Sequence, residues 1–344
     1  TVVIEATNSI LIPGTSGDGV YGAGAVTLTA GYDIRGGSSG NGITAVEADS
    51  GGVTLNADNN IYLGESGYAD VYADNSGNIV FNANNITLDN YTYVEAENGD
   101  VTFNAEGSIS VITRAPGEET AIYADNGGIY LYAGGNIEVL GGSYVEAAGD
   151  IEMYADYDVN VQGSYVWADD GYLDIWGGNN VNITDGSDLY SFDDMWIYAD
   201  NNIGIQNSTI YADWGYLDID ADYNVTIANS DLYGYDDVYI YGWDGDVTIT
   251  GSDIYSDWDL DIYAGNNVNI TDTTTYSADD TYVTTDSGSI GIYGSTITSD
   301  GNIEFLSAED ITICDNSLLE AGEDVELVAA GNITICANSR LVPG

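Results

Sequence analysis

The chain has 344 residues, of which 57 are Asp or Glu, three are Arg and none is Lys or His, so its formal net charge is -54. This charge excludes direct binding to nucleic-acid phosphates, and an anionic membrane surface would repel the chain for the same reason. Hydrophobic residues make up 44% of the sequence, which is enough apolar surface to support a folded core. No run of 18 apolar residues occurs, so we expect no insertion into a membrane.

One short phrase returns along the chain: Asn, Asp or Ser, then Ile or Val, any residue, and Ile, Val or Leu. The first copies start at Asp33, Asn60, Asn85 and Ser108, with wide and unequal gaps after each. Later copies follow at a nearly constant spacing and start at Asn136, Asp158, Asn180, Asn202, Asn224, Asp246, Asn267, Ser289, Asp310 and Asn332. Such a fixed period is typical of a repeat architecture. We predict one solenoid domain over 1–344, with irregular rungs and loop insertions in 1–135 and regular rungs in 136–344.

Each period contains three short segments with the alternation of a β-strand. The first has two aliphatic residues and then a small one, as in 53–57; the phrase forms the second; a third follows a Ser or Gly corner, as in 143–147. Strands this short bury apolar surface only by stacking on equivalent strands of the next rung, about 4.8 Å away. The pattern therefore predicts an all-β, right-handed parallel β-helix of about 14 three-stranded rungs. A leucine-rich repeat is the rival at this period, but Leu is scarce and no segment has a helical pattern.

Phrases such as 6–12 (ATNSILI) and 329–335 (AAGNITI) resemble the repeats of filamentous-haemagglutinin-type exoproteins. Members of that family are bacterial surface adhesins whose stalks are parallel β-helices. The resemblance covers nearly the whole chain and implies an extracellular, cell-surface location with a structural or adhesive role.

Paired carboxylates such as Asp193–Asp194, Asp236–Asp237 and Asp279–Asp280 raise the alternative of a polysaccharide-degrading enzyme. The acids recur at corner positions in rung after rung, and the usual basic partners are missing, so we expect no catalytic residues. We also expect no organic cofactor. Stacked carboxylates repel one another unless salt screens them or Ca²⁺ bridges them, and the sequence names no ligand set for such an ion.

Aromatic residues concentrate in the middle of the chain, where all six Trp lie. Outward strand positions at the rung spacing are occupied by Tyr132, Tyr154, Trp176, Tyr198, Tyr241 and Tyr263. Stacking between neighbouring rungs would explain such an aromatic face. The alternatives are lateral packing against another subunit and stacking on sugar rings.

The two cysteines, Cys314 and Cys336, are one period apart, and each follows a Thr-Ile dipeptide. They therefore occupy the same site in consecutive rungs. For a secreted protein we predict a disulfide between them.

We expect the two ends of the repeat region to be open strand edges. We assign Val2–Ile4 to the second strand of a rung and Ile10–Ile12 to the third, and we expect a complete rung from Val325 to Val342. The apolar residues predicted to form the assembly surfaces are Val2, Ile4, Ile10, Ile12, Val325, Leu327, Ile333, Ile335 and Leu341.

Open edges favour pairing with another copy of the chain, head to tail. The sequence therefore predicts an extracellular structural subunit of a filament, sheath or adhesin stalk, whose partner is itself. The second hypothesis is a surface adhesin that binds glycans through the aromatic face, and the third is the polysaccharide-degrading enzyme.

Overall fold

A computed structural model describes residues 1–12, 19–37, 43–64, 67–114 and 119–344. The described residues form 45 β-strands and no helix, so none of them forms a helix that could span a membrane. About 15 rungs each contribute one strand to three parallel sheets, here called A, B and C. The predicted all-β parallel solenoid is confirmed, with one rung more than the sequence count. Contacts divide the chain into two compact units, residues 1–177 and 178–344.

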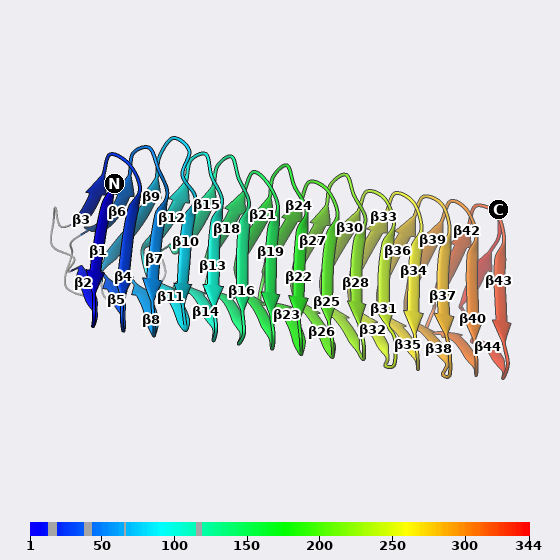
Figure 1. Ribbon diagram of the computed structural model, residues 1–344. Coiled ribbons are helices and arrows are strands. Elements are labelled where there is room, and N and C mark those ends of the chain that lie inside the picture. Colours follow the sequence, from blue (N-terminus) through cyan, green and yellow to red (C-terminus); the bar gives the residue numbers. More distant parts are fainter. Residues whose placement is uncertain (13–18, 38–42, 65–66, 115–118) are drawn as a thin grey trace. The chain divides into compact units, whose positions relative to one another are not determined.

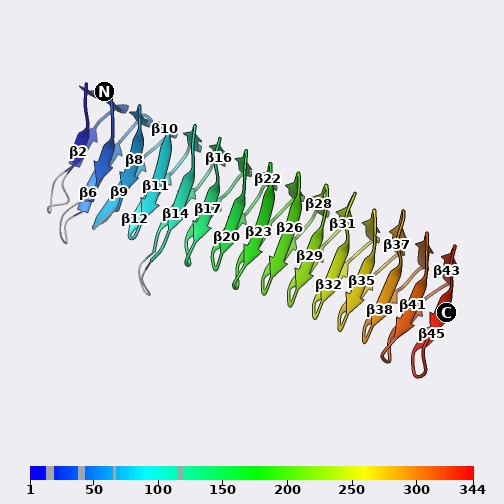
Figure 2. The ribbon, with the colours of Figure 1, turned by 90° about the horizontal axis from the view of Figure 1, so that it is seen from below.

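In residues 1–177, successive strands of each sheet lie side by side, as Figures 1 and 2 show. Sheet A contains β1 (Val2–Ala6), β4 (Val26–Ala30), β7 (Val53–Ala57), β10 (Ile79–Ala83), β13 (Val101–Ala105), β16 (Ile129–Ala133), β19 (Ile151–Ala155) and β22 (Leu173–Gly177). Sheet B contains β2 (Ile10–Ile12), β5 (Ile34–Gly36), β8 (Asn60–Leu63), β11 (Asn85–Asp89), β14 (Ile109–Ile112), β17 (Ile137–Leu140) and β20 (Val159–Gln162). Sheet C contains β3 (Gly19–Gly22), β6 (Ile43–Ala48), β9 (Tyr68–Ala73), β12 (Thr92–Ala96), β15 (Ala121–Ala124), β18 (Tyr144–Ala147) and β21 (Tyr165–Ala168).

Residues 178–344 repeat the same arrangement. Sheet A contains β25 (Met195–Ala199), β28 (Leu217–Ala221), β31 (Val238–Gly242), β34 (Leu260–Ala264), β37 (Thr281–Thr285), β40 (Ile303–Ser307) and β43 (Val325–Ala329). Sheet B contains β23 (Asn180–Thr184), β26 (Asn202–Gln206), β29 (Val225–Ala228), β32 (Val247–Thr250), β35 (Val268–Thr271), β38 (Ile290–Tyr293), β41 (Ile311–Cys314) and β44 (Ile333–Ile335). Sheet C contains β24 (Asp188–Ser191), β27 (Thr209–Ala212), β30 (Asp231–Gly234), β33 (Asp253–Ser256), β36 (Thr274–Ser277), β39 (Thr296–Ser299), β42 (Leu318–Ala321) and β45 (Arg340–Val342).

The core consists of columns of aliphatic side chains that point inward from the three sheets. In sheet B one such column runs in register through Ile183, Ile205, Ile227, Ile249 and Ile270. These side chains are at most 1% exposed. Alternation with period two places their strand neighbours outside, because successive residues of a strand face opposite sides of the sheet.

The corners explain why the repeated phrase begins with Asn or Asp. Between sheets A and B, the side-chain oxygen of Asn224 accepts the backbone N–H of Asp246 at 2.9 Å, and Asp246 accepts that of Asn267 at 2.9 Å. Each rung thus hydrogen-bonds the amide of the next one. Between sheets C and A, the carboxylate of Asp259 does the same for the N–H of Asp280 at 2.9 Å.

In several of the described rungs, the corner between sheets B and C contains a residue with a left-handed backbone. Asn207 and Asn229 adopt φ angles of 51° and 49° there, and Gly251 and Gly294 adopt 59° and 62°. Asn and Gly tolerate this conformation, whereas most residues do not. A buried Ser or Thr follows, and its hydroxyl binds backbone groups of its own and the preceding rung.

Two predictions for the N-terminal residues are wrong, because they assign the strands to the wrong positions within the rung. Val2–Ala6 forms β1 of sheet A, the first strand of a rung, and Ile10–Ile12 forms β2 of sheet B, the second. The reason is that Val2, Ile4 and Ala6 have the two aliphatics and the small residue of a first strand. They pair with Val26, Leu28 and Ala30 of β4. This rung is the one missing from the sequence count.

Candidate functional site

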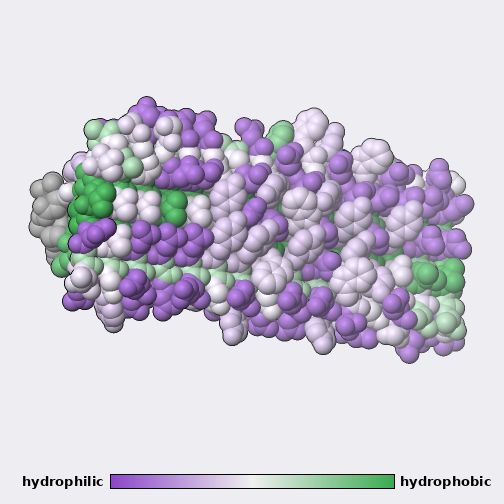
Figure 3. Space-filling model, viewed as in Figure 1, coloured by the Kyte–Doolittle hydropathy of each residue, from purple (hydrophilic) through white to green (hydrophobic). Residues whose placement is uncertain are grey.

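The outer face of sheet A combines aromatic side chains with acidic ones. Each strand exposes its second and fourth residues there; β19, for example, presents Glu152 and Tyr154, which are partly buried by their neighbours. Figure 3 views this face directly and shows pale aromatic side chains beside purple polar ones.

Phenol hydroxyls on this face donate hydrogen bonds to carboxylates of the next rung. Tyr132 donates to Glu152 Oε2 at 2.6 Å, and Tyr154 donates to Asp174. Glu152 also accepts a hydrogen bond of 2.8 Å from Tyr172. Each bond anchors the outer end of a ring, so the aromatic side chains are held in place.

The same pairs recur in residues 178–344. Tyr198 donates to Asp218 and Tyr241 to Asp261, each at 2.8 Å. The pairs run diagonally, from the fourth residue of one strand to the second residue of the next. The hydrogen bond from the phenol replaces part of the hydration that the carboxylate loses when it is buried.

Crowding on this face changes proton affinities. Burial raises the pKa of Asp174, Asp218 and Asp261, although the phenol hydrogen bond to each acts in the opposite direction. Burial also raises the pKa of Asp220 to about 6, against a hydrogen bond of 2.5 Å from the indole N–H of Trp243. The carboxylates therefore hold protons at a higher pH than they would in water.

The six predicted aromatic-face residues all lie at the fourth position of sheet A strands. Tyr132, Tyr154 and Trp176 are consecutive in register, with ring centroids of the first two 5.7 Å apart. Tyr241 and Tyr263 also pair. Asp220, however, stands between Tyr198 and Tyr241 in the register, so the column is interrupted there.

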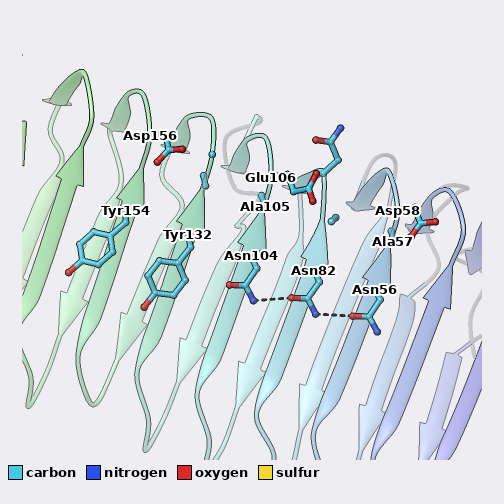
Figure 4. Close-up of a pocket in the computed structure, with 14 residues that line it drawn as sticks. Asn56, Ala57, Asp58, Asn82, Asn104, Ala105, Glu106, Tyr132, Tyr154 and Asp156 are labelled. Atoms are coloured by element: carbon cyan, nitrogen blue, oxygen red, sulfur yellow. Dashed lines mark hydrogen bonds between the residues drawn. The ribbon is translucent and has the colours of Figure 1, made fainter. Parts of the chain in front are cut away.

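A depression with a volume of about 740 Å³ lies beside Tyr132 on the outer face of sheet A. Figure 4 shows its floor, where Asn56, Asn82 and Asn104 precede Tyr132 and Tyr154 in one column. The amide of Asn82 donates to Asn56 at 2.8 Å, and that of Asn104 donates to Asn82 at 2.9 Å. The side chains of Asp58, Glu106 and Asp156 are exposed at the corner that borders it.

Sheet C carries an aromatic column that the sequence reasoning missed. It consists of Tyr190, Tyr211, Tyr233, Tyr255 and Tyr276, in register on consecutive rungs. Their rings stack, with centroids 4.4 to 5.9 Å apart. The available signal was a Tyr followed by Ala, Ser or Gly once per period, in the third strand of each of these rungs.

This sheet C column borders a smaller depression of about 330 Å³. The hydroxyls of Tyr233 and Tyr276 donate to Asp257 and Asp300 at 2.9 Å. The stacked rings cover one another's faces, which leaves mainly ring edges toward the solvent. This column suits rung-to-rung packing better than face-on stacking of a ligand.

Among the described residues, one group of three carboxylates is close enough to share a metal ion. Single oxygens of Asp259, Asp279 and Asp280 lie within 4.8 Å of one another. Asp280 already accepts hydrogen bonds from the backbone and side chain of Asn302, at 2.6 and 3.0 Å, and from Tyr282 at 2.7 Å. Hydrogen bonds between the corners of successive rungs therefore explain much of why these acidic residues are present.

Cys314 and Cys336 form a disulfide, with their Cα atoms 4.7 Å apart. The bond joins the last two rungs of the chain.

Two of the three arginines form ion pairs within the chain: Arg35 pairs with Asp33 at 3.2 Å and Arg114 with Asp89 at 2.6 Å.

The predicted assembly residues lie on the first and last rungs. Ile333 and Ile335 of β44 are 45% and 46% exposed, whereas Ile311 and Ile313, their partners one rung earlier, are fully buried. Val325, Leu327 and Leu341 are half-buried at the same edge. On the first rung, Val2 and Ile4 are half-buried, and Ile10 and Ile12 are buried.

No family model, curated protein or solved structure matches this chain.

Proposed function

We propose that this protein is an extracellular structural β-solenoid subunit that forms a filament, sheath or adhesin stalk by end-to-end stacking. The observation that carries the proposal is the rung-on-rung stacking itself, in which each rung buries the apolar columns of the rung before it, as β44 covers Ile311 and Ile313. Exposed apolar side chains beside unpaired strand edges favour association with another strand-bearing surface.

The first rung of a second copy has the side chains to cover this edge. Val2, Ile4 and Ala6 would follow Val325, Leu327 and Ala329 in sheet A. The spacing agrees, because the sequence interval from Val2 of β1 to Ile10 of β2 equals that from Val325 of β43 to Ile333 of β44. A second copy would thus continue the apolar columns in both sheets.

The outward side chains at such a junction avoid direct repulsion. In continued register, Glu326 would lie next to Val3, and Glu5 next to Val328. Inside the chain, by contrast, Glu304 and Glu326 are direct register partners. The junction therefore adds no pair of adjacent carboxylates in sheet A, although the total charge of each copy still opposes association at low salt.

The disulfide and the sequence of the repeats support an extracellular, structural role. The disulfide between the last two rungs suits an oxidising compartment. The resemblance of the repeats to filamentous-haemagglutinin-type adhesins agrees with a stalk-like assembly.

The test is assembly of the full chain at high salt, followed by electron microscopy and sedimentation. We expect filaments, because a contact between different ends of a subunit propagates. Ile333→Glu should weaken association by at least about 100-fold, since it places an unpaired carboxylate in the apolar column.

Leu306→Glu is the matched control for this experiment. It adds the same charge at an outward side chain that is already 44% exposed on β40, one rung from the edge. Assembly should persist in this variant. A native chain that stays monomeric at high salt, or equal losses in both variants, would refute the proposal.

A further inference from the structure

The depression on the outer face of sheet A in residues 1–177 has the properties of a ligand site. Its floor changes along one column from three amides, Asn56, Asn82 and Asn104, to two aromatic rings, Tyr132 and Tyr154. Because Asn is much smaller than Tyr, the surface is hollowed over the amides and bordered by the first ring (Figure 4). The site lies on a sheet face, away from the strand edges used in the proposed stacking.

The amide ladder can bind hydroxyl groups. A side-chain amide has two N–H donors and an oxygen with two lone pairs. In Asn82, one donor binds Asn56 and one lone pair accepts from Asn104, which leaves a donor and an acceptor for a ligand. A sugar hydroxyl both donates and accepts, so a row of such amides matches a polyhydroxylated chain.

The two tyrosines provide a preorganised platform. Figure 4 shows the rings of Tyr132 and Tyr154 broadside, so that one face of each is turned away from the sheet. Their hydroxyls are anchored on Glu152 and Asp174, which limits ring motion before a ligand binds. The faces of aromatic rings attract the weakly positive C–H groups of a pyranose.

Charge and repeat distance narrow the ligand class. Asp58, Glu106 and Asp156 border the depression, and the chain has a net charge of -54, so an anionic glycan would be repelled. Successive rungs are about 4.8 Å apart, close to the length of one sugar in an extended chain. We propose that this depression binds a neutral, β-linked polysaccharide in ribbon conformation, with sugars stacked on Tyr132 and Tyr154 and hydroxyls bonded to the amide ladder.

The proposal is tested by calorimetry with three soluble probes: a β-linked glucose hexamer, an α-linked glucose hexamer and a galacturonate hexamer. We expect only the β-linked hexamer to bind the native chain. Tyr132→Ala should weaken this binding by about tenfold or more, and Tyr132→Phe, which keeps the ring, should stay within about threefold of the native chain. Asn82→Ala should weaken binding as well, through lost hydrogen bonds.

Tyr198→Ala is the matched control, because Tyr198 has the same sheet position and the same phenol–carboxylate bond but lies beside Asp220. Tyr198→Ala should leave the affinity for the β-linked hexamer unchanged. Ile333→Glu should also leave it unchanged, which would show that glycan binding does not depend on assembly. Thermal unfolding of each variant checks that it is folded. Failure of the β-linked hexamer to bind, tighter binding of the galacturonate, or unchanged affinity in folded Tyr132→Ala would overturn the proposal.

Discussion

Replacing Ile227 with Asp tests the register of the core at its most regular point. Ile227 is fully buried in β29, between Ile205 and Ile249 of the adjacent rungs. Truncation to Ala should cost about 2–5 kcal/mol, from lost burial and from the cavity left behind. Asp should cost several kcal/mol more, because no partner for a carboxylate lies in a column of isoleucines.

The comparison uses urea unfolding followed by circular dichroism, together with hydrogen exchange of the backbone amides of neighbouring rungs. Exchange is informative because rungs contact mainly their neighbours, so that damage can remain local instead of unfolding the whole chain. We expect the amides of β26 and β32 to lose protection along with those of β29.

Thr226→Asp is the control for this prediction, since Thr226 precedes Ile227 on the same strand and is exposed. It should change stability by no more than about 0.5 kcal/mol. If Thr226→Asp destabilised the chain as much as Ile227→Asp, or if Ile227→Asp were neutral, the assignment of inward and outward faces would be wrong.

Two further predictions concern charge. The pKa of Asp220 is about 6 in the folded chain, against an ordinary value of 3.8, so the stability linked to this group is present below pH 3.8 and lost as the pH rises through 6. Melting temperature should therefore fall between pH 3.8 and pH 6, and Asp220→Asn should reduce that fall; an unchanged slope would contradict the assignment. NaCl should raise the melting temperature by screening the carboxylates, and a larger effect of CaCl₂ at matched ionic strength would show that Ca²⁺ is coordinated, whereas equal effects would exclude it.

The repeat pattern alone was sufficient to predict the parallel solenoid and most of its register. Inward residues alternate with outward ones within a strand, and equivalent positions recur once per period between rungs, so one assignment determines all the others. The same periodicity placed Cys314 and Cys336 at equivalent sites. The error at Val2–Ile4 arose because a short aliphatic strand fits more than one position when only its alternation is considered.

The candidate site depended on information that the repeat does not carry. Sequence spacing placed Tyr132 and Tyr154 on one face, but it did not show that Asn56, Asn82 and Asn104 continue their column, because the early rungs vary in length. Val53 pairs with Ile79, and Val101 pairs with Ile129 across a longer interval of sequence. Only the folded chain aligns these side chains.

The chain's periodicity therefore determined which residues point inward, because burial of aliphatic side chains is a local property of each strand and each rung repeats it. The tertiary structure decided which outward side chains are neighbours. Asp220 interrupts the predicted aromatic face, five tyrosines stack on sheet C, and three asparagine amides lie in the same column as two tyrosine rings. Such contacts follow from the lengths of the intervening corners. Because a loop insertion shifts sequence spacing without changing the ladder, only the hydrogen-bonded register reveals them.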